Sequence, residues 1–285
     1  MSHPAETLPS QALRLWERPV PVALVSIGAL TLLGWAALFV EAVRRGGGAD
    51  AFLEALCTPA AILEAPSLAG ALAALGVSIA LWIAMSVAMM LPTASALLVG
   101  YAEKAEAARE AGLRAASPLV LGAGYLAVWI ALSVGVAVAQ TAVSAGFASV
   151  DLPERLLGVL GGAALGAAGL YQFTAFKLSC LVAVGAPFKA DGPGWLTSRR
   201  AVFRLGLVQG LRCVGCCWAM MAVLVVLGAM NLVWMAVFSA VMAAEKTIAT
   251  ERVAQIVGAG LILAGLALSL QAAGGLEAIG RYLAG

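Results

Sequence analysis

The sequence predicts an all-α membrane protein, a polytopic bundle of about seven transmembrane helices. Hydrophobic residues make up 62% of the 285 residues and charged residues only 11%, which is too little charge to solvate a globular surface of this size. The mean hydropathy is +0.99, and the apolar residues form runs close to the roughly 20 residues that cross a bilayer. We therefore expect residues 20–285 to form a single transmembrane domain in contact with lipid, after a cytoplasmic tail over residues 1–19.

Seven apolar runs are the candidate spans. The run nearest the N-terminus is longer than the apolar core of a cleaved signal peptide, so we expect it to remain as the first span. Residues 205–244 carry two of the runs, and two helices there require a tight reversal near Gly228 and Asn231, residue types that favour turns. Without that reversal, 205–244 is one long span. The candidate spans lie at residues 20–40, 68–91, 118–141, 156–176, 211–228, 230–245 and 253–273.

The basic residues predict the orientation of the bundle. With the N-terminus in the cytoplasm, thirteen of the 17 Lys and Arg residues fall on the cytoplasmic side and four on the other side. Cytoplasmic loops of membrane proteins carry such an excess, so the pattern favours a cytoplasmic N-terminus and an external C-terminus. The net charge is only +2 and is spread over short connecting segments, which excludes nucleic acid as an expected partner.

Three cysteines near the start of the fifth span are the clearest sign of chemistry. Cys213, Cys216 and Cys217 occupy positions i, i+3 and i+4, which lie on one face of a helix. Thiolates are soft ligands that suit Cu(I), zinc or an iron centre. Cys213 and Cys216 also form a C-x-x-C pair, which is typical of a dithiol redox couple. Buried cysteines also serve as small apolar core residues.

Further sulfur atoms are expected at a similar depth toward the cytoplasmic face. Met85, Met89 and Met90 precede a proline at the inner end of the second span, and Cys180 follows the fourth span. We therefore expect these four residues to join the cysteine triplet in one metal site. The sole histidine, His3, lies in the tail, so the site is dominated by sulfur. Thioethers are good Cu(I) ligands, and copper is therefore favoured over zinc or iron.

Several charged and small residues have structural interpretations. Lys177 is expected to anchor its helix at the membrane interface by snorkelling, and Glu245 and Lys246 are read as interfacial charges at the end of the sixth span. A stripe of Gly158, Gly162 and Gly166 predicts close helix packing, within the chain or with a protein partner or second copy. Two amphipathic segments, 50–62 and 102–115, are expected at the membrane surfaces.

Five blocks of sequence stand out in order along the chain. They are Trp82-x-x-Met85-x-x-x-Met89-Met90-Leu91-Pro92, Gly124-Tyr125-x-x-x-Trp129, Tyr171-Gln172-x-Thr174-x-x-Lys177-x-x-Cys180-Leu181, Gly206-x-x-x-Gly210-x-x-Cys213-x-Gly215-Cys216-Cys217-Trp218-x-Met220-Met221 and Gly228-x-Met230-Asn231-x-x-Trp234-Met235. Together they resemble the bacterial family of predicted metal-binding integral membrane proteins called DUF2182, over about residues 80–250. This resemblance implies a multi-pass protein of the bacterial inner membrane with a metal site. Relatives tend to carry a further Cys-Arg pair after the third block, where this chain has Val184 and Gly185.

The sequence favours metal handling or transport over catalysis. It contains no paired carboxylates, no nucleophile with a neighbouring base and no phosphate-binding loop. Two alternatives remain open. One is a membrane thiol-disulfide protein that uses Cys213 and Cys216, and the other is a structural subunit of a larger membrane complex that packs through the glycine stripe.

Overall fold

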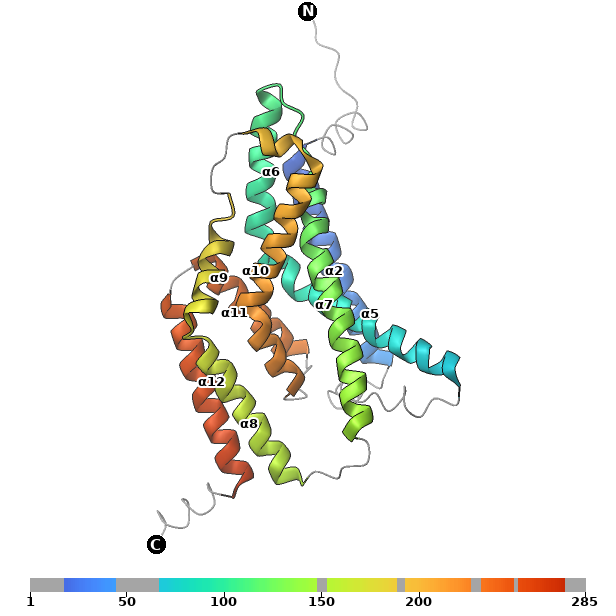
Figure 1. The fold of residues 1–285 in the computed structure, drawn as a ribbon, viewed down its shortest axis with the longest axis vertical. Helices are drawn as coiled ribbons and strands as arrows, with labels where there is room; N and C mark the ends of the chain where they lie inside the picture. Colours follow the sequence, from blue (N-terminus) through green and yellow to red (C-terminus); the bar gives the residue numbers. More distant parts are fainter. Residues whose placement is uncertain are drawn as a thin grey trace, which may run out of the picture.

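The computed structural model describes residues 18–44, 67–147, 153–188, 193–226, 232–248 and 251–274. Within these ranges the regular structure is entirely helical (Figure 1), which confirms the predicted all-α class. The elements are α2 (Pro19–Arg44), α5 (Leu68–Thr93), α6 (Ser95–Glu110), α7 (Pro118–Phe147), α8 (Glu154–Tyr171), α9 (Ala175–Gly185), the 3-10 helix η1 (Pro193–Thr197), α10 (Arg199–Val226), α11 (Leu232–Ile248) and α12 (Glu251–Ala272).

Five of the described helices are long and apolar enough to cross a membrane, namely α2, α5, α7, α10 and α12. The bent pair α8 and α9 brings the number to six if it forms one span. The helix α11, which corresponds to the sixth predicted span, has 17 residues. The count of seven spans and the orientation therefore stay predictions. The predicted reversal between α10 and α11 and the amphipathic segment 50–62 lie outside the described residues.

Two helices are interrupted in the interior of the bundle. Pro92 lies in the last turn of α5, and the chain turns at Ala94 before α6 begins. Proline lacks a backbone N–H and weakens the helix around it, and α5 ends one residue after Pro92. The second interruption separates α8 from α9 at residues 172–174, where the axis bends by 60°. Both breaks lie beside the cysteine-bearing part of α10. Lys246 contacts both Thr93 and Cys213, and Tyr171 donates to the Gly215 carbonyl oxygen.

Glycines bring α7 and α10 into close contact. The Cα atoms of Gly124 and Gly206 face each other, so that a Cβ added at Gly124 would lie 3.1 Å from the Gly206 Cα and would press on the Phe203 carbonyl oxygen. Such small residues allow two backbones to approach closely. The contact places Tyr125, the next residue of α7, against the cysteine-bearing turn of α10.

The predicted glycine stripe is used largely inside the chain. A Cβ at Gly158 would meet Ala272, and one at Gly162 would meet the Gly265 carbonyl oxygen, both on α12. Gly166 has nothing within 4 Å of its added Cβ. The stripe therefore packs α8 against α12 at two of its three positions, and a protein partner at this face stays a prediction.

The substitution Gly124→Ala tests the close contact between α7 and α10. Overpacking of this kind lowers the free energy of unfolding by about 1 to 3 kcal/mol, so we expect a lower melting temperature of the detergent-solubilised protein. Gly135→Ala is the matched control on the same helix, because its added Cβ meets nothing within 4 Å. Equal melting temperatures for the two variants would contradict the packing described here.

Candidate metal centre

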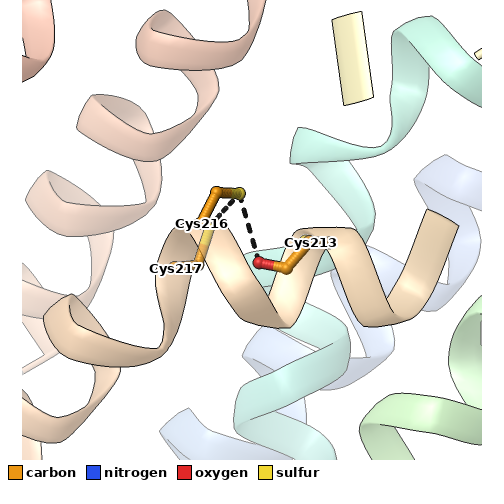
Figure 2. A group of neighbouring side chains, drawn as sticks. All are labelled: Cys213, Cys216 and Cys217. Carbon is orange, nitrogen blue, oxygen red and sulfur yellow. Dashed lines mark hydrogen bonds between the residues drawn. The ribbon is translucent and has the colours of Figure 1, made fainter. Parts of the chain in front are cut away.

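The cysteine triplet forms a compact group of sulfur atoms inside the bundle. Cys213, Cys216 and Cys217 are each at most 2% exposed, and their Sγ atoms all lie within 4.8 Å of one another. The Sγ atoms of Cys216 and Cys217 are 3.3 Å apart, and the Cys216 thiol donates to the Cys213 carbonyl oxygen at 3.2 Å (Figure 2). All three are free thiols. We call this group the cysteine trio.

The spacing of the trio fits a single shared metal ion. Thiolates bind zinc at about 2.3 Å, so two thiolates on one ion of similar size lie up to about 4.6 Å apart. The Sγ atoms of the trio all lie within 4.8 Å of one another, which is compatible with that value. The consecutive turns of α10 bring about this arrangement, because positions i, i+3 and i+4 share one face of a helix.

Side chains from three other helices surround Cys213. The Lys246 ammonium of α11 donates to the Cys213 Sγ at 3.0 Å and to the Thr93 Oγ1 of α5 at 2.5 Å. The Tyr125 hydroxyl of α7 lies 3.0 Å from the same Sγ and donates to the Met90 carbonyl oxygen at 3.2 Å. The interrupted end of α5 thus supplies both a hydroxyl and a carbonyl group to this network.

Lys177, Glu245 and Lys246 correct the sequence-based interpretation, because they are buried inside the bundle and not exposed at its surface. Lys177 and Glu245 form an ion pair of 2.8 Å between α9 and α11, with side chains 1% and 2% exposed. Lys246 is 8% exposed and contacts the cysteine trio. Successive residues of a helix point in different directions, so Glu245 and Lys246 serve separate neighbours. The interpretation was wrong because the end of α11 packs into the interior.

The three predicted methionine ligands lie in the core around the trio. Met85, Met89 and Met90 are at most 1% exposed and belong to the same buried cluster as the three cysteines. Met89 also accepts, through its carbonyl oxygen, a hydrogen bond of 3.2 Å from Ser239 on α11. Their role as metal ligands stays a prediction, supported by this placement.

Cys180 occupies a different position from the trio. It is partly exposed on α9, and its Sγ lies 2.7 Å from the point where a Cβ of Gly215 would be. It does not belong to the group of Sγ atoms within 4.8 Å of one another. The Tyr171 hydroxyl, at the end of α8, donates to the Gly215 carbonyl oxygen and fastens the bent segment to α10. The participation of Cys180 in metal binding stays a prediction.

Sequence reasoning did not single out Tyr125 or Thr93. The sequence feature that could have indicated Tyr125 is its position directly after Gly124. A tyrosine next to a glycine that allows close helix packing lies at the interface between the two helices. Thr93 follows Pro92, and its hydroxyl donates to the Met90 carbonyl oxygen at 2.8 Å. Thr side chains in helices commonly form such a hydrogen bond to a carbonyl oxygen three or four residues earlier.

Comparison with known proteins identifies the family of the chain. Residues 79–268 match the family described as PpoB2, copper chaperone. The chain belongs to this family of copper chaperones. The match agrees with the expected metal handling, whereas the name DUF2182 stays a prediction. No curated protein and no solved structure matches the chain.

The buried ion pair generates a prediction for stability. Glu245→Gln leaves the Lys177 ammonium buried without an anion, and loss of one partner of such a pair costs about 3 to 5 kcal/mol. We expect a clearly lower melting temperature in detergent. The double variant Lys177→Met with Glu245→Leu removes both charges and should recover most of the loss. A single variant as stable as the wild type would contradict a buried pair.

Proposed function

We propose that this protein is a copper chaperone of the bacterial inner membrane that holds Cu(I) as cargo between Cys213, Cys216 and Cys217. The observation that carries the proposal is the group of three buried thiols whose Sγ atoms lie within 4.8 Å of one another. Its presence in a chain of the copper chaperone family supports copper as the metal. Thiolates together with neighbouring thioethers form a soft donor set, which Cu(I) prefers.

Lys246 has a defined role in this proposal. Thiolates in an apolar interior require a nearby positive charge, because burial of an isolated charge is strongly unfavourable. The Lys246 ammonium lies 3.0 Å from the Cys213 Sγ and is held from the other side by Thr93. It stabilises the thiolate form of Cys213, which is the form that binds metal.

The placement in the membrane rests on the five apolar helices and on the distribution of charge. Arg199, Arg200 and Arg204 lie on the first turns of α10, at the end of the bundle where α2 begins, and Lys104 lies on α6 toward the same end (Figure 1). The helix α12 ends at the opposite end (Figure 1). A cytoplasmic N-terminus places this basic end inside, as the excess of Lys and Arg in cytoplasmic segments favours.

The same geometry supports a second candidate, a thiol redox role. The C-x-x-C pair of Cys213 and Cys216 has Sγ atoms within 4.8 Å of each other. Oxidation of two such thiols to a disulfide would release two electrons and two protons to an external oxidant. A reversible two-electron titration of the metal-free protein, with no copper binding, would favour this candidate over the chaperone.

A competitive titration tests the proposed copper site. The anaerobically purified protein is titrated with Cu(I) against a chromophoric chelator. We expect one tightly bound Cu(I) per wild-type chain and loss of that binding in each of Cys213→Ser, Cys216→Ser and Cys217→Ser. Cys180→Ser is the matched control, because its thiol lies outside the trio, and it should retain the bound ion. Unchanged binding in the three trio variants would contradict the proposal.

Lys246→Met tests the charge at the site. A hydrogen bond to a charged group contributes about 1.5 to 3 kcal/mol, so we expect the Kd for Cu(I) to rise roughly 10- to 100-fold. Lys104→Met is the control, because Lys104 is an exposed residue of α6. The same Kd for both variants would show that Lys246 does not stabilise the bound state.

A further inference from the structure

The described methionines share the main core of the bundle with the cysteine trio. Each of them is at most 7% exposed, and all belong to the core cluster that contains the trio. They come from α5, α10 and α11, the three helices that Lys246 joins at Cys213.

Contacts between helices set the level of each methionine along the bundle. At one level, Lys246 of α11 joins Thr93 of α5 and Cys213 of α10. At a second level, the Ser239 hydroxyl of α11 donates to the Met89 carbonyl oxygen of α5.

A third level is marked by an apolar cavity of about 290 Å³, which is lined by Trp82 and Ser86 of α5 and by Met221 of α10, among others. From the first level to the third, the contacts move toward the N-terminal ends of α5 and α11 and toward the C-terminal end of α10.

The methionine residues therefore succeed one another along the helices of the bundle. Met220 continues the face of Cys213 and Cys217 by one further turn of α10, at spacings of three and four residues. On α11, Met235 and Met242 share a face with Ser239, which contacts α5. From Cys213 to Met221 the rise along α10 is about 12 Å. We call the set Met85, Met89, Met220, Met221, Met235 and Met242 the thioether column.

We propose that the thioether column is a second Cu(I)-binding region, which conducts the ion between the cysteine trio and the end of the bundle where α10 ends and α11 begins (Figure 1). This inference rests on the proposed function, because it gives the trio a route for its cargo. With a cytoplasmic N-terminus, the column leads from the trio toward the external face of the membrane.

The chemistry of the two donor types gives the route a direction. A thioether is neutral and binds Cu(I) without losing a proton, whereas a cysteine binds metal as a thiolate. Transfer breaks a bond from copper to a thioether sulfur and forms one to a thiolate sulfur. The oxidation state of copper is unchanged, and any proton displaced from a thiol passes to water. The anionic trio binds the ion more tightly, so it is the end of the route at which copper accumulates.

Selenium labelling tests the thioether column directly. The full-length protein is produced with selenomethionine, loaded anaerobically in detergent with one and then two equivalents of Cu(I), and studied by X-ray absorption at the copper edge. We expect the first equivalent to show mainly sulfur neighbours, and the second to show a selenium shell. The variant Met85→Leu, Met220→Leu, Met235→Leu removes half of the column, so it should have a smaller selenium shell but keep the first site.

The outcomes separate this inference from the proposed function. Absence of selenium neighbours in the wild type at two equivalents would overturn the thioether column and leave the trio intact. A selenium shell of undiminished size in the triple Met→Leu variant would also overturn it. A third outcome is that copper shows selenium neighbours at both equivalents and that its sulfur shell is the same in Cys217→Ser as in the wild type. This outcome would support thioether binding and contradict the proposed cysteine site.

Discussion

The contact between Lys246 and Cys213 is the interaction on which the rest of the structure depends. A lysine inside an apolar bundle needs an acceptor, because an unpaired buried charge is strongly unfavourable. The Cys213 Sγ and the Thr93 hydroxyl are those acceptors, and they lie on two further helices. The contact therefore holds α5, α10 and α11 together at one point. It also places a positive charge next to the only group of three clustered thiols among the described residues.

Both interrupted helices serve this centre. At the break after α5, the Met90 carbonyl oxygen accepts a hydrogen bond from Tyr125, and Thr93 lies beside Lys246. The bend between α8 and α9 is capped by Thr174, which accepts from the Lys177 backbone N–H, and it directs the Lys177 side chain to Glu245. Irregular backbone at membrane depth persists where protein buries it. These two breaks lie where polar chemistry is concentrated, as binding sites in other membrane proteins are.

Local patterns made part of this arrangement predictable. The helices follow from the length of the apolar runs, and the trio follows from the spacing of Cys213, Cys216 and Cys217. The pairing of Lys177 with Glu245 was not predictable, because these residues are 68 positions apart and their contact depends on which helices are neighbours. The same reason accounts for Lys246, which looked interfacial at the end of its helix, and for Cys180, whose expected depth did not bring it into the trio.

The metal content of the protein purified from cells tests the central claim most directly. The wild type and a variant with Cys213, Cys216 and Cys217 all changed to serine are purified anaerobically from copper-supplemented cells, and bound metals are measured by mass spectrometry. The account predicts about one copper per wild-type chain and none in the variant, with equal folding of both by circular dichroism. Equal copper in the two proteins, or zinc in place of copper in the wild type, would contradict it.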